Sequence, residues 1–507
     1  MNQGNTEEAR RRLAELLEAR GEWVVREGGA AAAQPCGEWE LRAASGGLWF
    51  SYWGAGAARA WRVSRWEERG GKLWLEASRR MGAEHARLEL VPRATFAEGA
   101  AAVAAARRTT CARLAALVSA ESAGSRVERA RLSRGARRGA EGRYARVLLR
   151  AGRRLWAATG PVVPLGADET EAFLASALLW FARLGARSGA GEARALWLVA
   201  GAKLARAVAE RVALLGEGWR ACVAVYEVDE DLTRLTRVES PGLCELLMRA
   251  GPRLKRRPPT EVTSELAARA VELSPAAIDV VRARGGETLR FRGLPFARAR
   301  RVAGRELLWF GVGREGKRRP LAESNRAELL KLVNELEEHR RADAPDRAHA
   351  LYRAAPEAWL EWLLRRDVTR LDPGLRLAPL HAQLRASHAA GGVARPLDLL
   401  ALRRDGRLAV VEIKASEDAA HALQGADYWR RIYAHHRAGH ITRAGLFSDA
   451  EISDAPPLVY LVAPLLRVHR SFEMVARAVR PDIEIYRFDL NEDWRAGVRV
   501  ARRVRPD

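Results

Sequence analysis

The sequence predicts a multidomain α/β protein, and its length, its apolar content and the changing pattern of its apolar residues support that prediction. A chain of 507 residues is long enough for two or three domains, each with its own core. Apolar residues make up 48% of the chain, which argues against an intrinsically disordered protein. The pattern divides the chain into a small β-rich domain with an N-terminal helix (1–95), an arginine-rich α/β region (96–342) and a C-terminal α/β domain (350–507).

The first region begins with a charged amphipathic segment, so residues 1–20 are expected to form a helix and not a signal peptide. Residues 22–93 contain short runs such as GLWFSYW and KLWLEA, in which apolar and polar side chains alternate. Alternation at even spacing predicts a small antiparallel sheet or barrel. Its many tryptophans could stack on nucleic-acid bases, but packing in the core is the favoured interpretation.

The middle region mixes helical and strand-like patterns. Helical periodicity predicts three helices, over 96–118, 125–156 and 168–187. A βαβ-like unit is then expected, with a strand at 195–200, a helix at 202–215 and a strand at 220–227. After the proline-marked break at 254–260, the sequence predicts strands within 286–313, a helix at 321–341 and a linker at 341–350.

The charge of the chain points to a polyanionic partner. The net charge is +23 and the pI is about 10.9. Residues 96–344 carry 45 basic and 29 acidic groups, a net charge of +16, and residues 125–156 hold eleven arginines against two acids. A helix with a basic face that grips backbone phosphates is the hypothesis for 125–156. A solvated arginine face in an arginine-rich proteome is the competing interpretation.

The most informative segment is 395–429, which predicts a strand, a tight turn, a second strand and a helix. The runs 397–402 and 408–413 are apolar except for Asp398 and Glu412, and an Asp-Gly turn lies between them. An acid in an apolar strand is costly unless it is paired or holds a metal. Glu412 and Lys414 share one strand face, because side chains alternate along a strand, and the hairpin can bring Asp398 beside them.

This arrangement suits metal-assisted phosphodiester chemistry. Two carboxylates are ligands for a hard divalent cation such as Mg²⁺, which can polarise a phosphoryl oxygen and activate a water. Lys414 can steady that water and the charge that develops on phosphate. Gln424 and Tyr428 are four residues apart and therefore share one face of the following helix, from which they can contact the phosphate or the water.

These residues resemble the PD-(D/E)xK nuclease superfamily, and the Gln-x-x-x-Tyr spacing looks like its RecB-like branch. The resemblance covers the last third of the chain and implies a restriction-endonuclease-like α-β-β-β-α-β core. It implies that Asp398 and Glu412 hold Mg²⁺ or Mn²⁺ and that Lys414, with Gln424 and Tyr428, completes the catalytic set. The family's Pro-Asp is Pro-Leu-Asp here.

The resemblance also implies a metal-binding glutamate on the preceding helix, expected within 356–373. Glu357 and Glu361 lie four apart on one face, and Glu361 is the favoured ligand, with a solvated glutamate as the alternative. Downstream, a strand at 458–462, a helix at 471–479 and a strand at 483–488 complete the order α-β-β-β-α-β-α-β over 350–490.

Other motifs in the chain are weaker. Glu315-Gly316-Lys317 repeats the Glu-x-Lys spacing without an upstream Asp, and 311–317 fits the start of a phosphate-binding loop but lacks the Ser or Thr that should follow. His435, His436 and His440 invite a zinc interpretation, but solvated or interface histidines are favoured. His381 and Gln383 alternate on the first strand of the C-terminal sheet, where one could face the site but outward packing is favoured.

The sequence therefore predicts a metal-dependent nuclease that acts on DNA in repair, recombination or defence. A nuclease-fold protein that binds DNA without cutting it and a ligand-activated sensor-effector nuclease are the alternatives. The chain has no 18-residue uncharged apolar run and four scattered cysteines, so no membrane span and a reducing cytoplasmic location are expected. A homodimer is also compatible with the sequence.

Overall fold

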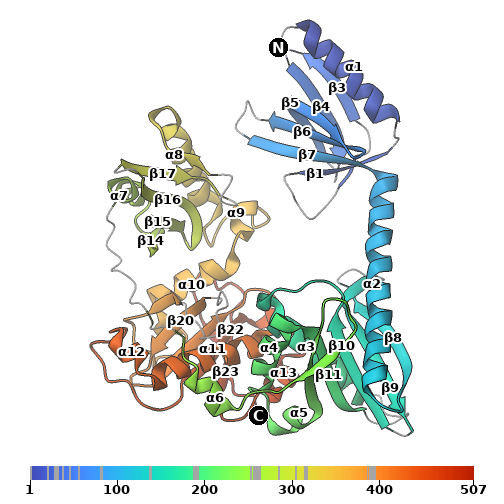
Figure 1. Cartoon of the computed structure of the whole chain (residues 1–507). Coiled ribbons are helices and arrows are strands. Elements are labelled where there is room, and N and C mark those ends of the chain that lie inside the picture. The colour runs from blue at the N-terminus through green and yellow to red at the C-terminus, as the bar shows by residue number, and fades with distance from the viewer. Residues whose placement is uncertain are drawn as a thin grey trace. The chain divides into compact units, whose positions relative to one another are not determined.

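Four β-sheets organise the part of the chain that the structure describes (Figure 1). The structure is a computed structural model. It describes every residue except 1–2, 20–21, 28–33, 37–38, 45–46, 55–56, 80–83, 136–139, 153, 186–192, 252–253, 255–263, 284–285, 303–304, 313–317, 385, 387–395 and 507. The chain divides into two units, one formed by Met1–Ala112 with Arg134–Gly142 and the other by Arg113–Ser133 with Arg143–Asp507. The mixed α/β class expected from the sequence is confirmed.

The first unit contains α1 (Gln3–Ala19) and an antiparallel seven-stranded sheet. The strand order is β2-β1-β7-β6-β5-β4-β3. Leu13 and Leu17 of α1 pack on Trp23 and Trp61, which are almost fully buried. The N-terminal helix, the antiparallel sheet and the core role of these tryptophans are confirmed. The strands are β1 (Trp23–Glu27), β2 (Gln34–Cys36), β3 (Trp39–Ala44), β4 (Gly47–Gly54), β5 (Ala57–Arg69), β6 (Lys72–Arg79) and β7 (Glu84–Pro92).

The helix expected at 96–118 is present as α2 (Arg93–Glu121), but the helix expected at 125–156 is wrong. That segment forms the strands β8 (Arg126–Arg134), β9 (Glu141–Ala151) and the start of β10 (Arg154–Pro161). Arginines at 143, 146 and 150 have helix-like spacing, yet Val147 and Leu149 are both buried on one side of β9, which is the period of a strand. Pairing with β10 gives this alternation its buried face.

A six-stranded sheet, called the second sheet here, has the order β13-β12-β11-β10-β9-β8. Strands β11 (Ala193–Gly201) and β12 (Val223–Val228) are parallel and are connected through α4 (Ala202–Val212), so the βαβ unit is confirmed. The second strand begins later than expected because residues 217–222 form a short helix. The remaining elements are α3 (Thr170–Gly185), which confirms the helix expected at 168–187, α5 (Glu217–Cys222), β13 (Leu235–Val238), α6 (Leu243–Met248) and the 3-10 turn Ala167–Glu169.

The third sheet is antiparallel, in the order β14-β15-β16-β17-β18. It confirms the strands expected at 286–313 and is packed by α7 and by α8, the helix expected at 321–341. The phosphate-loop alternative cannot be placed, because 313–317 lie outside the described residues. The elements are α7 (Glu265–Glu272), β14 (Ile278–Ala283), β15 (Gly286–Phe291), β16 (Leu294–Val302), β17 (Arg305–Phe310), β18 (Arg319–Pro320), the 3-10 turn Glu323–Asn325 and α8 (Arg326–His339).

The fourth sheet carries the residues singled out in the sequence, in the strand order β19-β20-β21-β22-β23-β24. Strands β21, β22 and β23 run parallel, and the other neighbours are antiparallel. The helices and strands expected over 350–490 all form, in the expected order. The elements of this region are α9 (Ala350–Arg353), α10 (Pro356–Arg366), β19 (His381–Leu384), β20 (Leu397–Leu402), β21 (Leu408–Ile413), α11 (His421–Arg437), α12 (His440–Arg443), β22 (Leu458–Pro464), α13 (Phe472–Ala478), β23 (Ile485–Leu490) and β24 (Val500–Val504), of which α9, α12 and β24 were not expected, with 3-10 turns at Val368–Arg370 and Leu465–Arg467.

The second and fourth sheets share one apolar core. Trp429 of α11 and Val459 of β22 belong to the same buried cluster as Leu178 of α3 and Leu196 of β11. The backbone of residues 214–216 also bonds to that of residues 478–480, through Gly216 N–H to Ala478 O at 2.9 Å and Arg480 N–H to Leu214 O at 3.0 Å. The fourth sheet therefore shares part of its hydrophobic core with the second sheet.

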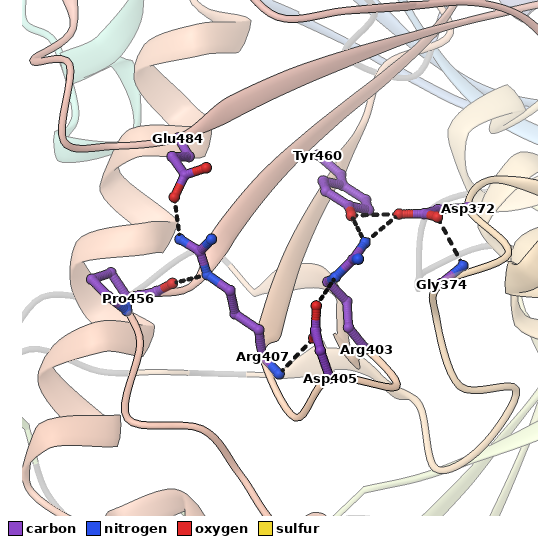
Figure 2. A network of polar contacts seen from close by, with 8 residues as sticks. All are labelled: Asp372, Gly374, Arg403, Asp405, Arg407, Pro456, Tyr460 and Glu484. Carbon is purple, nitrogen blue, oxygen red and sulfur yellow. Dashed lines mark hydrogen bonds and ion pairs between the residues drawn. The ribbon is translucent and has the colours of Figure 1, made fainter.

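A polar network holds the turn of the β20–β21 hairpin (Figure 2). Arg403 donates to Asp372 at 2.7 Å and to the Tyr460 hydroxyl at 2.8 Å, which fixes the turn to β22. Arg407 donates to the Pro456 carbonyl at 2.6 Å and to Glu484 at 2.5 Å. Because a slip of one residue would turn every side chain to the opposite face, these anchors protect the register of the hairpin.

Within the described residues, no helix combines the length and the apolar character needed to cross a membrane.

Candidate functional site

The β20–β21 register brings Asp398 and Glu412 together. Leu399 pairs with Val411 and Leu400 with Val410. One further step in this register sets Asp398 opposite Glu412. The Asp398 carboxylate Oδ2 accepts the Ile413 backbone N–H at 2.8 Å, so the side chain itself ties the ends of the two strands together.

Electrostatics shows that the two carboxylates are poorly neutralised. Burial and the neighbouring Glu412 charge raise the pKa of Asp398 well above its ordinary value. Burial also raises the pKa of Glu412, which is 2% exposed, although Lys414 opposes the shift. Glu412 Oε2 is buried and has no hydrogen-bond partner among the described residues. Two close acids with an unpartnered oxygen are the arrangement that a bound cation would stabilise.

Lys414 is attached to this pair. Its Nζ donates to Glu412 Oε1 at 2.9 Å and lies 3.9 Å from Asp418 Oδ2. Burial alone would lower the pKa of Lys414, but the charges of Glu412, Glu357 and Asp418 outweigh it and raise the pKa. Lys414 is therefore a protonated, partly buried donor whose position is set by Glu412.

Helix α11 supplies Gln424 and Tyr428 as buried side chains. Gln424 Oε1 is buried and has no hydrogen-bond partner among the described residues. Burial raises the pKa of Tyr428, and the charges of Glu412 and Asp398 raise it further, so the phenol stays protonated close to the two acids. His421, at the start of α11, has Nε2 at 3.2 Å from the Glu412 carbonyl, and burial with the Lys414 charge lowers its pKa to about 4. The imidazole is therefore neutral near pH 7.

Buried ion pairs fix α11 to the helices of the second sheet. Asp427 Oδ2 lies 3.2 Å from Arg211 Nη2 of α4, and Arg211 Nε donates to Glu171 of α3 at 2.8 Å. Arg430 donates to Asp427 at 2.6 Å. Asp427 and Arg430 are 1% exposed, and three neighbouring arginine charges hold the pKa of Asp427 well below its ordinary value despite burial. The helix that carries Gln424 and Tyr428 is thus held rigidly.

Glu361 is connected to Asp398 through the side chain of Gln383. Gln383 Nε2 donates to Glu361 Oε2 at 2.8 Å and lies 3.5 Å from Asp398 Oδ1, so the amide bridges the two carboxylates. The other oxygen of Glu361 lies 3.4 Å from Arg290 Nη1 of the third sheet. Among the described residues, no group of three or more His, Cys, Asp or Glu side chains is arranged to hold a metal.

Glu357, the alternative to Glu361, lies on the Lys414 side of the site. Its Oε1 accepts from the Ala415 backbone N–H at 3.4 Å, and its charge acts on both Glu412 and Lys414. The carboxylates of Asp398 and Glu412 supply oxygen donors, the type that a hard divalent cation prefers. Glu361 and Glu357 of α10 are the two candidates for a third carboxylate.

Sequence reasoning missed His421 and Arg290, and it favoured the wrong face for Gln383. Gln383 faces the site, against the favoured outward packing, because the pairing of Ala382 with Leu399 and of Leu384 with Leu397 sets it opposite Asp398. His421 and Arg290 carried no motif; a buried histidine at a helix start is the one signal that could have been found. His381 contacts the Leu446 carbonyl.

The three histidines considered as a zinc site lie between α11, α12 and the loop that follows them. His435 is fully buried, with Nδ1 at 2.9 Å from Nδ1 of His440, and His436 Nε2 lies 3.0 Å from the Ser453 carbonyl. The expectation that they are solvated is wrong for His435. They fasten α11 to α12 and to the loop that follows, and the described residues around them supply no further ligand.

The site as described combines two facing acids, a lysine, an unpartnered amide oxygen and a phenol at the ends of β20 and β21 and on α11. No protein-family model, no curated protein and no solved structure matches the chain.

Proposed function

We propose that the chain is a Mg²⁺- or Mn²⁺-dependent nuclease that hydrolyses phosphodiester bonds, with DNA as its substrate, in repair, recombination or defence. The observation that carries the proposal is the Asp398–Glu412 pair, whose oxygens lack sufficient donors, beside the Lys414 ammonium. We propose further that residues 356–490 form a restriction-endonuclease-like core, which the order of α10, β19, β20, β21, α11 and β22 supports.

Asp398 and Glu412, joined by Glu361, would hold the cation. When bound, it supplies charge stabilisation at the phosphoryl oxygen and a more acidic water. Lys414 Nζ is a charged donor for the attacking water or for a phosphate oxygen, and Glu412 sets its direction. Gln424 Oε1 can accept a proton of that water, and the protonated Tyr428 hydroxyl can donate to a phosphate oxygen.

The experiment is a cleavage panel with the purified full chain. Single-stranded, duplex and branched DNA and RNA are incubated with Mg²⁺, Mn²⁺ or EDTA. Metal-dependent products are expected for the wild type, and Lys414→Ala and Asp398→Ala should lower the rate by about 100-fold or more, as loss of a charge-stabilising group does. Lys331→Ala is the matched control, because this lysine is exposed on α8 of the third sheet.

Binding is measured in parallel by fluorescence anisotropy in EDTA. We expect the two site variants to bind DNA as the wild type does. If the wild type leaves every substrate intact with both metals, the enzyme proposal fails. Retained DNA binding would then identify the non-cleaving alternative.

A further inference from the structure

An arginine-lined cavity of about 450 Å³ lies between α13 and the edge of the fourth sheet, outside the candidate site. Its cationic lining comes from the loop before α13, from α13, from β23 and from the C-terminal strand. These residues are Arg470, Arg477, Arg487, Arg502 and Arg505. A second cavity of about 420 Å³ adjoins it and shares Arg477 and Arg505.

The positive charges that line this cavity are not balanced by acidic residues in the same lining. Glu473 is its one acid, and it is already engaged by Arg487. The side chains of Arg470, Arg477 and Arg502 are exposed, and the described residues include no hydrogen-bond or ion-pair partner for them. Several guanidinium groups around one space repel each other, and an anion removes that repulsion.

An ion pair and a ring contact hold Arg487, at the base of the cavity, in a fixed position. Arg487 is 7% exposed, and Asp489 holds it in a bidentate ion pair, with Nε–Oδ1 at 2.8 Å and Nη2–Oδ2 at 3.1 Å. Its guanidinium also lies over the Phe472 ring, 5.0 Å from the centroid. Arg502 stands opposite Asp489 in the β23–β24 ladder and thus on the same sheet face.

Protection of an edge strand is the competing explanation, because exposed charges on an edge strand such as β24 prevent pairing with other chains. That role requires arginines on β24 only. Here Arg470 and Arg477 come from a different element and converge on the same cavity, which edge protection does not require.

The cavity is linked to the candidate site through two side chains. The Phe472 ring, which lines the cavity, lies edge-on to His421 with centroids 6.2 Å apart. His421 Nε2 in turn lies 3.2 Å from the Glu412 carbonyl. These two contacts connect the wall of the cavity with the strand that carries Glu412.

We propose that the cavity around Arg470, Arg477 and Arg502 binds backbone phosphates of the nucleic-acid substrate. This inference rests on the proposed function. Guanidinium groups suit it because they match phosphate oxygens in a two-pronged geometry and stay charged at every relevant pH. A free nucleotide carries the same phosphate chemistry, so the experiment separates the two sources.

The test compares two double variants of the full chain that remove the same charge. Arg470→Ala/Arg502→Ala removes two cavity arginines, and Arg404→Ala/Lys331→Ala removes two exposed cations elsewhere. Binding of labelled duplex and single-stranded DNA is measured by anisotropy in EDTA at several salt concentrations. We expect the cavity variant to bind about tenfold more weakly per arginine at 0.1 M salt, and its log–log salt slope to fall by about 2. The control should stay close to the wild type.

Equal weakening in both double variants would overturn the proposal, because a diffuse charge effect would then explain it. Inorganic pyrophosphate and ATP are titrated into the same proteins by calorimetry. If the cavity variant loses pyrophosphate or ATP binding and keeps its affinity for DNA, the nucleic-acid assignment is overturned in favour of a free nucleotide. Because binding is read in EDTA, it stands apart from cleavage, whose absence would count against the nuclease proposal alone.

Discussion

At the scale of single residues, Asp398 and Glu412 form an electrostatically unfavourable pair within the folded protein. Two carboxylates face each other in a buried setting, burial raises the pKa of both, and Glu412 Oε2 has no donor in the described part of the chain. Arrangements of this kind cost stability and persist where a function uses them. Lys414 offsets part of the cost, since it pairs with only one oxygen of Glu412.

Asp398→Asn should therefore stabilise the metal-free protein. The amide removes one negative charge and can donate to Glu412 Oε2, while its oxygen can still accept the Ile413 N–H. We expect a gain of roughly 1–3 kcal/mol, the scale of a close charge pair at an intermediate dielectric after partial offset. Thermal unfolding in EDTA measures it. With Mn²⁺ the wild type should gain stability and the variant should not. A variant that melts below the wild type in EDTA would contradict the account.

The third carboxylate can be identified by a matched pair of variants. Glu361→Gln removes the charge next to Gln383, and Glu357→Gln removes the charge next to Ala415. We expect Glu361→Gln to raise the Mn²⁺ concentration for half-maximal stabilisation by about tenfold or more, the usual cost of a lost ligand or supporting group. Glu357→Gln should change it by less than about threefold. The reverse order would assign the role to Glu357.

At the scale of elements, the hairpin and α11 place the site, and each has its own anchor. The hairpin is fixed at its turn by Arg403 and Arg407 (Figure 2). Helix α11 is fixed by Asp427 and Arg211. The hairpin anchor lies at the turn, at the opposite end of β20 from Asp398, whereas Asp427 directly precedes Tyr428 on α11. The acid pair can therefore remain strained without shifting the elements that carry it.

Arg403→Ala should destabilise the second unit, because Asp372 is 5% exposed and would lose a charged donor. Asp372 would still accept hydrogen bonds from the Tyr460 hydroxyl and the Gly374 N–H. We therefore expect the free energy of unfolding to fall by about 1–3 kcal/mol. Arg404→Ala, one residue on and exposed, should change stability by less than about 0.5 kcal/mol. Urea unfolding followed by tryptophan fluorescence measures both. Equal midpoints for the two variants would exclude the anchoring role.

At the scale of the whole molecule, the expected boundary near residue 350 does not separate two packed bodies. Residues Arg143–Asp507 belong to one unit, and the apolar core of α11, β22 and α13 continues into the second sheet. Arg211 and Asp427 form a buried ion pair across the same contact. A buried charge that loses its partner typically costs about 3–5 kcal/mol.

A fragment of residues 350–507 should accordingly fail to fold alone. It would expose Trp429, Val459 and Phe472 and would leave Asp427 without Arg211. A fragment of residues 113–507 keeps both sheets and should give a monodisperse protein with a cooperative thermal transition. Size-exclusion chromatography and calorimetry compare the two fragments. A well-folded, cooperative 350–507 fragment would contradict the shared core.

The sequence alone determined the order of elements from α10 to β23 and the proximity of Asp398, Glu412 and Lys414. Two short apolar runs and the Asp-Gly turn between them are local signals, and a hairpin follows from them directly. Local signals also explain the error at 125–156, where arginine spacing resembled a helix face and only pairing with β10 showed that Val147 and Leu149 form one buried side.

Only the tertiary structure decided how the acids are neutralised and what surrounds them. Gln383 reaches Glu361 and Asp398 through the pairing of β19 with β20. Arg290 reaches Glu361 from 71 residues away, and the cavity arginines come from separate elements. Such contacts depend on how sheets and helices pack. Packing is set by the summed burial of many side chains, which no short segment records.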